Sequence, residues 1–248
     1  QPASKRQICR SFQTLLVILW IQHSFLTKSR RIMGRNMSVS AVIVTGAGSG
    51  IGLACARGLL RDGSTVAATD IGEIPEELAA DGNCLQLSFD ISSEAACFDA
   101  VKATVERFGG IRAVIHFAGI HHTKTWEEVT PEDFARVYAV NVTGSFLIAR
   151  AAAREIREAG SAIVLTASGG VELGGVGGDS RGGPSCISSK AAIRGLTRSL
   201  ARSLGTNNIR VNAVSPGATE TPMIGTYDNV ARDSAIGRTP LGRIALPE

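Results

Sequence analysis

The 248-residue sequence lacks any pair of cysteines spaced as CxxC or as a metal site. Its five cysteines are scattered and odd in number, which argues against a disulfide framework. We expect reduced thiols, which indicate an intracellular, cytoplasmic protein, and we predict no metal cofactor. The cysteines are Cys9, Cys55, Cys84, Cys97 and Cys186.

A long apolar run is also missing from the N-terminal region. The stretch from Leu15 to Ile21 is shorter than the ~20 residues that span a bilayer, so no membrane partner is expected. Residues 1–36 loosely resemble a signal peptide or an organelle transit peptide. We favour a third interpretation, upstream translated sequence before a native start at Met33 or Met37, which would form a loosely packed basic tail.

Acidic residues are absent from the same 36 positions, which hold seven lysines and arginines. The net charge of +4 therefore comes from the tail, because residues 37–248 contain 19 basic and 22 acidic residues, a balance of −3. The body gives no indication of a nucleic-acid partner. No internal repeat and no convincing linker divide it, and 44% hydrophobic residues suffice for one substantial core, so we expect a single domain over residues 37–248.

A glycine-rich turn follows the first apolar run of that body. The segment Thr45–Gly52 reads TGAGSGIG and lies between apolar residues 41–44 and a predicted helix. Glycines allow a tight turn and a close approach to phosphates, which the N–H groups of the helix N-terminus can bind. A second predicted strand, Thr65–Thr69, is followed by Asp70, whose carboxylate suits the ribose hydroxyls of NAD and would repel the 2′-phosphate of NADP. The alternative is a glycine turn that binds no nucleotide, beside an aspartate exposed to solvent.

Short apolar runs alternate with longer amphipathic ones along the rest of the chain. The runs are rich in β-branched residues, which favours parallel strands covered by helices on both faces. The pattern predicts a Rossmann-type doubly wound α/β fold with three layers. Further strands are expected at 84–89, 112–117, 162–166 and 209–214, and helices at 94–108, from Thr130 onward, and at 188–204.

Ligands of such sheets bind beyond the carboxyl ends of the strands, which makes the residues there site candidates. Asp90 either meets the adenine or caps the following helix. The histidines His116, His121 and His122 lack a carboxylate partner at metal spacing, and we interpret them as surface or loop residues. The other candidates that follow strands are Ile91, Ala118, Gly119, Ser168, Pro216 and Gly217.

Over residues 41–248 these motifs together resemble the short-chain dehydrogenase/reductase family. The family's Asn-Asn-Ala-Gly motif corresponds to residues 116–119, and its proline-glycine turn to residues 216–217. The resemblance implies an NAD-dependent oxidoreductase that transfers hydride between nicotinamide C4 and the carbon of an alcohol or carbonyl, as a homodimer or homotetramer. It implies cofactor contacts at Gly46, Ser49, Gly50, Ile51, Gly52, Asp70, Ile71, Asp90, Ile91, Ala118, Gly119, Lys190, Pro216, Gly217, Thr219 and Thr221.

The resemblance also implies a catalytic set of Asn141, Ser168 and Lys190. In the family, serine fixes the substrate oxygen and asparagine orders a water that links lysine to solvent. A tyrosine four residues before the lysine is the acid or base, and the lysine lowers its pKa and holds the ribose. The i, i+4 spacing places both side chains on one helix face.

Cys186 occupies that tyrosine position in this chain. The two tyrosines, Tyr138 and Tyr227, lie outside the motif. A thiol can carry a proton, but its sulfur lies one bond past Cβ and falls short of a substrate placed for a phenol. We therefore expect catalysis of the family type to be strongly reduced unless a water bridges the gap.

Other departures from the family pattern concern the sheet. Phe117 replaces an asparagine that ties strands together, and the glycine-rich segment 168–186 is longer than is common. Residues 241–248 resemble the lead-in to the family's last helix and strand. A missing seventh strand would expose a sheet edge, so low stability or aggregation is expected.

Three functions remain open on the sequence alone. The first is an NAD-dependent alcohol dehydrogenase or ketoreductase, impaired at Cys186. The second is an NAD-binding protein without turnover that serves regulation or assembly. The third and weakest is a thiol-dependent enzyme that uses Cys186 beside Lys190, since no histidine lies next to the thiol in sequence. We expect the substrate to be set by a loop at 223–238 and by a segment beyond residue 248.

Overall fold

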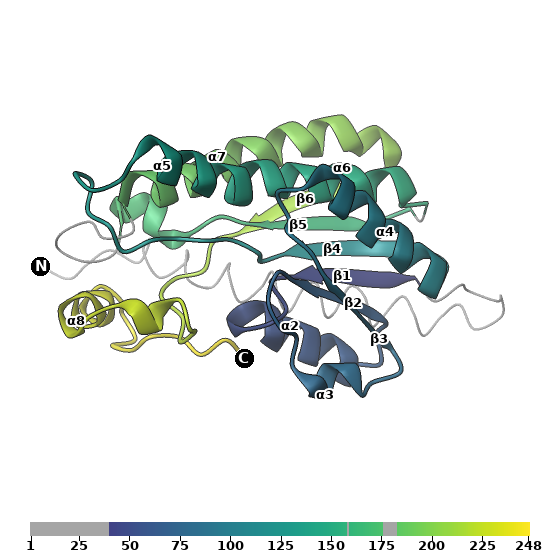
Figure 1. Cartoon of the computed structure of the whole chain (residues 1–248), viewed down its shortest axis with the longest axis horizontal. Helices are drawn as coiled ribbons and strands as arrows, with labels where there is room; N and C mark the ends of the chain where they lie inside the picture. Colours follow the sequence, from purple (N-terminus) through teal and green to yellow (C-terminus); the bar gives the residue numbers. More distant parts are fainter. Residues whose placement is uncertain (1–39, 158, 176–182) are drawn as a thin grey trace, which may run out of the picture. The chain divides into compact units, whose positions relative to one another are not determined.

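The computed structural model describes residues 40–157, 159–175 and 183–248. The predicted tail, residues 1–36, lies outside this part of the chain. In the described residues, six parallel strands form one sheet in the order β3-β2-β1-β4-β5-β6 (Figure 1). The strands are β1 (Ala41–Thr45), β2 (Val66–Asp70), β3 (Cys84–Ser88), β4 (Ile111–His116), β5 (Ala162–Thr166) and β6 (Arg210–Val214).

Helices connect the strands in the alternating pattern expected from the sequence. The seven α-helices of the described residues are α2 (Gly50–Arg61), α3 (Glu76–Ala79), α4 (Glu94–Phe108), α5 (Pro131–Tyr138), α6 (Ser145–Glu155), α7 (Gly183–Leu204) and α8 (Asn229–Gly237). A π-helical segment, η1 (Ala139–Gly144), joins α5 to α6. Three short 3₁₀ segments are η2 (Gly169–Leu173), η3 (Gly205–Asn207) and η4 (Ile224–Thr226).

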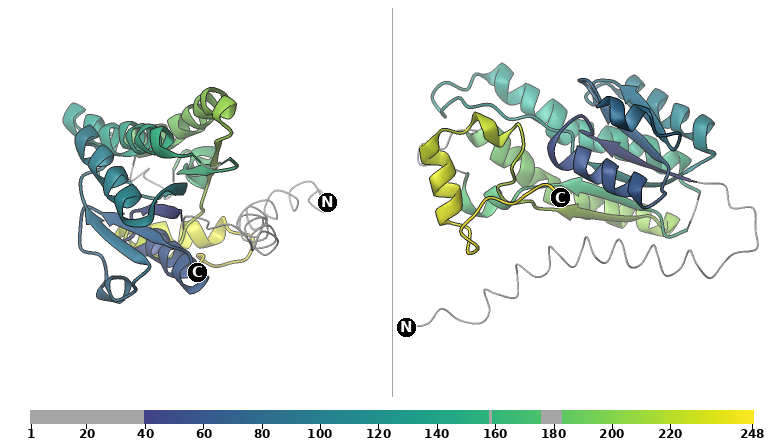
Figure 2. Two further views of the ribbon diagram at one scale, coloured as in Figure 1. Left: turned by 90° about the vertical axis from the view of Figure 1, so that its right-hand side faces the viewer. Right: turned by 90° about the horizontal axis from the view of Figure 1, so that it is seen from below.

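The two faces of the sheet bury separate apolar clusters because alternate strand residues point to opposite faces. Ile43 and Ala67 face the cluster shared with α4, α6 and α7, whereas Val42 and Val44 face the cluster shared with α2 and α3. Figures 1 and 2 agree that α2 and α3 cover one face and α4, α6 and α7 the other. The predicted three-layer Rossmann-type fold is therefore confirmed.

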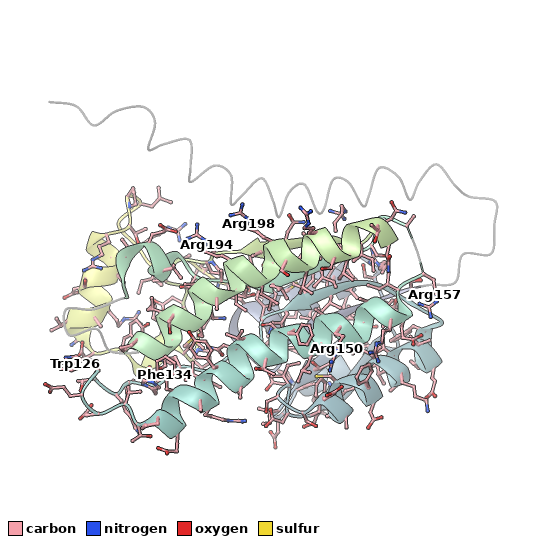
Figure 3. All side chains as sticks on the ribbon, turned by 90° about the horizontal axis from the view of Figure 1, so that it is seen from above. Trp126, Phe134, Arg150, Arg157, Arg194 and Arg198 are labelled. Atoms are coloured by element: carbon pink, nitrogen blue, oxygen red, sulfur yellow. The ribbon has the colours of Figure 1, made fainter. Side chains whose placement is uncertain are left out.

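The covering helices are anchored by packing inward and carry charge outward. Seen from above in Figure 3, α6 and α7 lie side by side over the sheet. Arg194 and Arg198 project from the outer side of α7. Arg150 of α6 lies over the rings of Phe98 and Phe146, with its guanidinium 5.8 and 5.0 Å from their centroids.

Local capping fixes where α4 and α5 begin. Ser93 accepts a hydrogen bond from the Ala96 N–H at the start of α4. At α5, Thr130 accepts from the N–H of Asp133, and the Asp133 carboxylate accepts from the Thr130 N–H at 3.0 Å. This capping box satisfies N–H groups that a helix leaves free. The predicted starts of both helices are confirmed.

Two helical predictions need correction. The helix from Thr130 is not continuous, because η1 interrupts it and places Asn141 in the widened turn. The helix predicted from Ser188 begins at Gly183, so Cys186 lies inside it. Residues 223–238, predicted as a loop, hold η4 and α8 instead.

Candidate functional site

A pocket of about 400 Å³ opens at the carboxyl ends of the strands. Residues that follow β1 through β6 line it, together with the first turns of α7 and the segment after β6. All predicted cofactor contacts lie in its wall, namely Gly46, Ser49, Gly50, Ile51, Gly52, Asp70, Ile71, Asp90, Ile91, Ala118, Gly119, Lys190, Pro216, Gly217, Thr219 and Thr221.

The turn after β1 is a cradle that larger residues would block. Gly46 has φ of +71°, and a Cβ atom there would lie 2.8 Å from the Ala118 nitrogen. A Cβ atom on Gly52 would collide with the Gly46 carbonyl. The helix α2 starts at this turn, and its N-cap residue Ser49 makes no side-chain capping bond. The turn therefore presents close backbone and an uncapped helix N-terminus, the features that suit a pyrophosphate.

Asp70 ends β2 and braces the same turn. Its Oδ2 accepts a hydrogen bond from the Gly48 N–H at 2.9 Å, and its Oδ1 accepts from the Gly72 N–H at 3.0 Å. A carboxylate has about four lone-pair positions, so both oxygens can accept further hydrogen bonds from hydroxyls. Ile71, beside it, is 66% exposed at the rim. The site thus places a carboxylate next to the glycine turn.

Asp90 lies in the pocket wall but is not the cap of the following helix, which is Ser93. Its Oδ1 accepts from the N–H and the hydroxyl of Ser92 at 2.8 and 2.7 Å. Its Oδ2 forms an ion pair with Arg136 at 3.1 Å. The hydrogen bonds from Ser92, together with Arg136, lower the pKa of Asp90. The alternative that Asp90 caps α4 is therefore wrong, and its contact with adenine stays a prediction.

The predicted catalytic residues Ser168, Cys186 and Lys190 line one side of the pocket. Lys190 donates a hydrogen bond from Nζ to the Thr166 carbonyl at 2.9 Å, which ties α7 to the end of β5. Ser168 begins η2, and its hydroxyl accepts from the Gly170 N–H at 3.1 Å. The hydroxyl, thiol and amine therefore line one pocket, and their catalytic roles stay predictions.

The electrostatics of this trio oppose an activated thiolate. Burial raises the pKa of Cys186, and the Lys190 charge offsets only part of that rise. Burial also lowers the pKa of Lys190. Reactive cysteines need a lowered pKa, so the thiol-dependent hypothesis loses its physical basis.

Asn141 does not line the pocket but supports it from below. It is 1% exposed in η1, and its Oδ1 accepts from the Ile120 N–H at 2.8 Å. Its Nδ2 donates to the Ile120 carbonyl and to the Ser189 hydroxyl, both at 3.0 Å. These bonds join the loop after β4 to α7 next to Lys190. That Asn141 orders a water molecule stays a prediction. The structure shows that Asn141 braces the loop after β4 against α7.

His116 is buried rather than on the surface, which corrects the sequence prediction. It is the last residue of β4 and is 1% exposed. Its Nδ1 shares a hydrogen bond with Thr45 Oγ1 at 2.7 Å, and burial lowers its pKa to about 3. The Thr45 hydroxyl also accepts from the Ala118 N–H. The neutral imidazole therefore fills a core position between the ends of β1 and β4.

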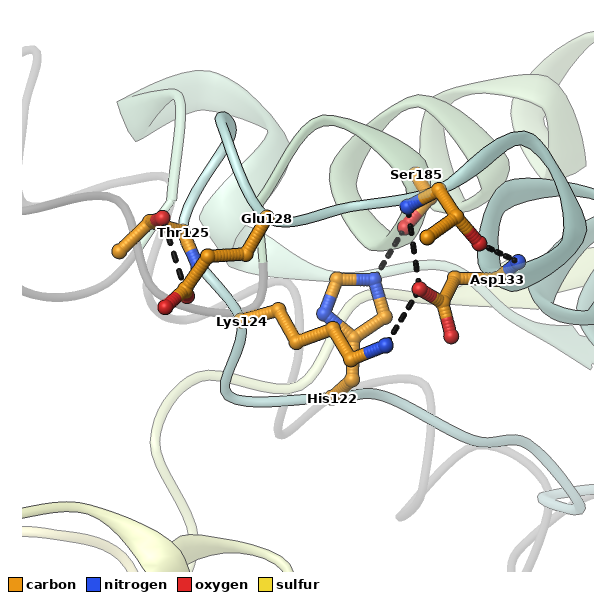
Figure 4. Close-up of polar contacts among 7 residues, drawn as sticks. His122, Lys124, Thr125, Glu128, Asp133 and Ser185 are labelled. Carbon is orange, nitrogen blue, oxygen red and sulfur yellow. Dashed lines mark hydrogen bonds and ion pairs between the residues drawn. The ribbon is translucent and has the colours of Figure 1, made fainter.

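The other two histidines lie in the loop after β4, as predicted. His122 bonds through Nε2 to the buried Ser185 hydroxyl at 2.8 Å, which fastens the loop to α7 one residue before Cys186 (Figure 4). Lys124, farther along the loop, forms an ion pair with Asp133 of α5 at 2.5 Å (Figure 4). No cluster of three or more potential metal-ligating side chains occurs in the described residues.

The pocket wall also holds His121 and Tyr227, to which the sequence analysis gave no role, although Tyr227 falls within the segment 223–238 that was expected to set the substrate. Their rings lie 6.2 Å apart at 60°, and His121 Nε2 is 3.2 Å from the Thr226 hydroxyl. Burial lowers the pKa of His121, and the charge of His122 lowers it further. Tyr227 follows η4, far from Cys186 in sequence, so no local motif could have placed it in the pocket.

None of the described helices combines the length and the apolar character needed to cross a membrane. Comparison with known proteins gives a consistent family. The family model described as enoyl-(acyl carrier protein) reductase matches residues 46–248. A 3alpha-hydroxysteroid dehydrogenase of Mediterraneibacter gnavus is 33% identical over 218 residues, which cover 83% of this chain and 84% of the relative.

Reductases provide two further similarities. A 3-oxoacyl-[acyl-carrier-protein] reductase of Thermotoga maritima is 30% identical, over 83% of this chain and 85% of that protein. The crystal structure of a 3-ketoacyl-(acyl-carrier-protein) reductase from Brucella melitensis, complexed with NADH, matches with a TM-score of 0.75 and 30% identity. That match covers 84% of this chain and 86% of the other.

Proposed function

Because the chain belongs to the short-chain dehydrogenase/reductase family of oxidoreductases, we propose that it moves hydride between a nicotinamide nucleotide and a small alcohol or carbonyl. One observation supports this most directly. The glycine turn with Asp70 and the trio Ser168, Cys186 and Lys190 line a single pocket. When bound there, the nucleotide supplies or accepts the hydride.

The residues present fit that cofactor. The Gly46 and Gly52 cradle and the uncapped start of α2 would hold the pyrophosphate, because added side chains would fill the space. The Asp70 carboxylate would accept hydrogen bonds from the hydroxyls of one ribose of the nucleotide. The Lys190 ammonium would donate hydrogen bonds to the hydroxyls of the other ribose. The Ser168 hydroxyl would hold the substrate oxygen.

We propose NAD(H) rather than NADP(H) as the nucleotide. The Asp70 carboxylate is anchored beside the glycine turn by two N–H groups, so it cannot readily turn away from a 2′-phosphate. Lysine and arginine contribute two residues to the pocket wall, Arg136, which pairs with Asp90, and Lys190, which bonds to Thr166. Because both cations already have partners, neither is available to neutralise a 2′-phosphate next to Asp70.

The test is a fluorescence titration of the chain with NADH and, in parallel, NADPH. We expect saturable binding that favours NADH by at least 10-fold, which is about 1.4 kcal/mol. The variant Asp70→Asn keeps the shape and removes the charge, so its preference should fall to near unity. Equal affinity of the parent for both nucleotides contradicts the NAD assignment, and no binding of either contradicts the proposed function.

The alternative of a nucleotide-binding protein without turnover gains no support from the relatives above, which are described as dehydrogenases and reductases. We also propose that the chain is cytoplasmic and dimeric or tetrameric. The first point is supported by free thiols at Cys55, Cys84, Cys97 and Cys186. The second rests on the family, and light scattering after size-exclusion chromatography tests it, a monomer being the contrary result.

A further inference from the structure

The proposed function requires a proton donor at the substrate oxygen, and this inference rests on that function. A carbonyl that gains hydride at carbon must gain a proton at oxygen. Cys186 stands where the family has its phenol, but its sulfur is attached directly to Cβ and burial raises its pKa. The pocket therefore needs an acid that reaches farther than the thiol.

Tyr227 enters the same pocket from a different element. It is half-buried in the segment between η4 and α8, and its N–H donates to the Ile224 carbonyl at 3.0 Å. The preceding residue, Thr226, contacts His121 through its hydroxyl, and the following residue, Asp228, caps α8 by accepting from the Ala231 N–H. Hydrogen bonds thus fix the residues on both sides of Tyr227, which holds the backbone of Tyr227 at the pocket wall.

Tyr227 and Cys186 line the same pocket. Burial raises the pKa of Tyr227, and a charged Cys186 raises it further. The titratable and charged groups that share the pocket with this phenol are Cys186 and Lys190 of α7, His121 of the loop after β4, and Asp70, Asp90 and Arg136 of the wall described above. A phenol in this setting stays protonated at neutral pH and can donate.

His121 is the competing donor, but its chemistry is less suitable. It must be an imidazolium to give up a proton readily, and its pKa is lowered below the ordinary 6.5. At neutral pH the ring is therefore mostly neutral. Its contact with Thr226 and its position against the ring of Tyr227 fit a residue that positions the phenol.

We propose that Tyr227 is the catalytic acid of this chain and replaces the phenol that is missing at position 186. In carbonyl reduction, a bound nicotinamide nucleotide would supply the hydride for the new C–H bond. The carbonyl π pair moves to oxygen, and the Tyr227 hydroxyl gives its proton to that oxygen. The phenolate is then reprotonated from solvent. In alcohol oxidation the same group can take the hydroxyl proton only after it has lost its own, which its raised pKa confines to alkaline pH.

The first test compares Tyr227→Phe with Tyr138→Phe in the full chain. Tyr138 stacks on Phe134 at 5.1 Å, does not line the pocket, and is the other of the two tyrosines. With NADH and either cyclohexanone or ethyl acetoacetate, kcat should fall by about 100-fold or more in Tyr227→Phe, the usual loss of a general acid. It should stay within about 2-fold in Tyr138→Phe, with NADH Kd unchanged in both.

The second test reads the phenol without turnover. In the Tyr138→Phe chain a single tyrosine remains, so tyrosinate absorbance titrates Tyr227 alone. We expect a pKa above the ordinary value of about 10 that falls when Cys186→Ala removes the neighbouring charge. An ordinary pKa that ignores this substitution would overturn the placement of the phenol beside the thiol.

The outcomes separate this inference from the proposed function. If the Tyr227→Phe variant binds NADH and reduces ketones as well as the parent, the role of Tyr227 is overturned and the dehydrogenase function stands. Binding of NADH without any turnover by the parent also overturns the role of Tyr227. Failure to bind any nicotinamide nucleotide overturns the proposed function itself.

Discussion

The two halves of the pocket follow the family pattern to different degrees. The nucleotide half, formed by residues 46–52, Asp70 and residues 118–119, matches it in every small residue and in the strand-end acid. The reaction half, formed by Ser168, Cys186, Lys190 and Tyr227, retains the serine and lysine but has a thiol at the phenol position.

This difference reflects what each half demands of its side chains. Binding a pyrophosphate depends on backbone N–H groups and on the absence of Cβ atoms, which one continuous segment can provide. Proton transfer depends on one atom lying within hydrogen-bond reach of the substrate, about 2.6–3.2 Å. A donor from any wall of the pocket can meet that demand. The reaction half can therefore change its acid while the nucleotide half stays intact.

The largest effect is expected from making the reaction half follow the family. In the Tyr227→Phe background, Cys186→Tyr places a phenol four residues before Lys190, whose charge would lower its pKa, and kcat should rise by about 100-fold or more. The measurement is NADH-dependent ketone reduction at saturating nucleotide. Cys186→Phe is the matched control, since it fills the same space without the hydroxyl.

A further substitution extends this prediction. In the Cys186→Tyr background, Tyr227→Phe should cost less than about 3-fold in kcat, because the new phenol takes over the proton. Equal rates for Cys186→Tyr and Cys186→Phe in the Tyr227→Phe background would contradict the interpretation that a phenol at position 186 can serve as the acid.

The nucleotide half can be disrupted by a single side chain. Gly52→Val would drive a Cβ into the Gly46 carbonyl, and NADH Kd should rise by about 100-fold, equivalent to about 2.7 kcal/mol. Gly58→Ala in the same helix is the control, because its Cβ would meet only the end of Arg61 at 4.0 Å. That change should leave Kd unaltered and stabilise the fold by about 0.5–1 kcal/mol. Similar losses of NADH affinity in both variants would contradict the proposal that the glycine turn binds the nucleotide because it lacks side chains.

The stability of the folded chain should decrease in acid because of His116, which is buried between the ends of β1 and β4. Its folded pKa of about 3 lies below the ordinary 6.5, so the unfolded state takes up the proton first as pH falls. The contribution to stability is fully present above pH 6.5 and is lost as pH falls toward 3. Between pH 7 and pH 5 the loss should be about 2 kcal/mol.

Urea denaturation at these two pH values measures the effect of His116. The variant His116→Asn cannot titrate and can still bond to Thr45, so its stability should change by about 2 kcal/mol less over the same interval. Parallel pH profiles for parent and variant would show that the imidazole is charged or exposed in the folded chain.

The smallest effect concerns the first turns of two helices. A side chain caps the start of α5, whereas no side chain caps the start of α2, which is proposed to bind the cofactor. Thr130→Ala removes the capping box of α5 and should cost about 1 kcal/mol of unfolding free energy. Ser49→Ala at α2 should cost almost nothing, because Ser49 makes no capping bond. Chemical denaturation without nucleotide measures both. An equal cost at the two positions would contradict the view that the start of α2 is reserved for the cofactor.

The parallel sheet and the nucleotide half could be predicted because their signals are local. Residues 94–108 and 162–166 have the predicted bounds, since Ser93 and Gly109 flank the helix and a short apolar run defines the strand. The prediction was wrong where distant contacts decide. The interruption at Asn141 and the burial of His116 depend on Ile120, Ser189 and Thr45, which lie far away in sequence.

The doubly wound fold, the glycine turn and Asp70 could be recognised in the amino-acid sequence alone, and the replacement of tyrosine by Cys186 is a prediction from the same source. These features follow from the order of neighbouring residues, because helix and strand periods and tight turns are short-range properties. Which phenol shares the pocket with that thiol was settled only by the packing of the chain. Tyr227 and Cys186 are 41 positions apart, and such a pair meets only when the whole sheet and its covering helices have packed.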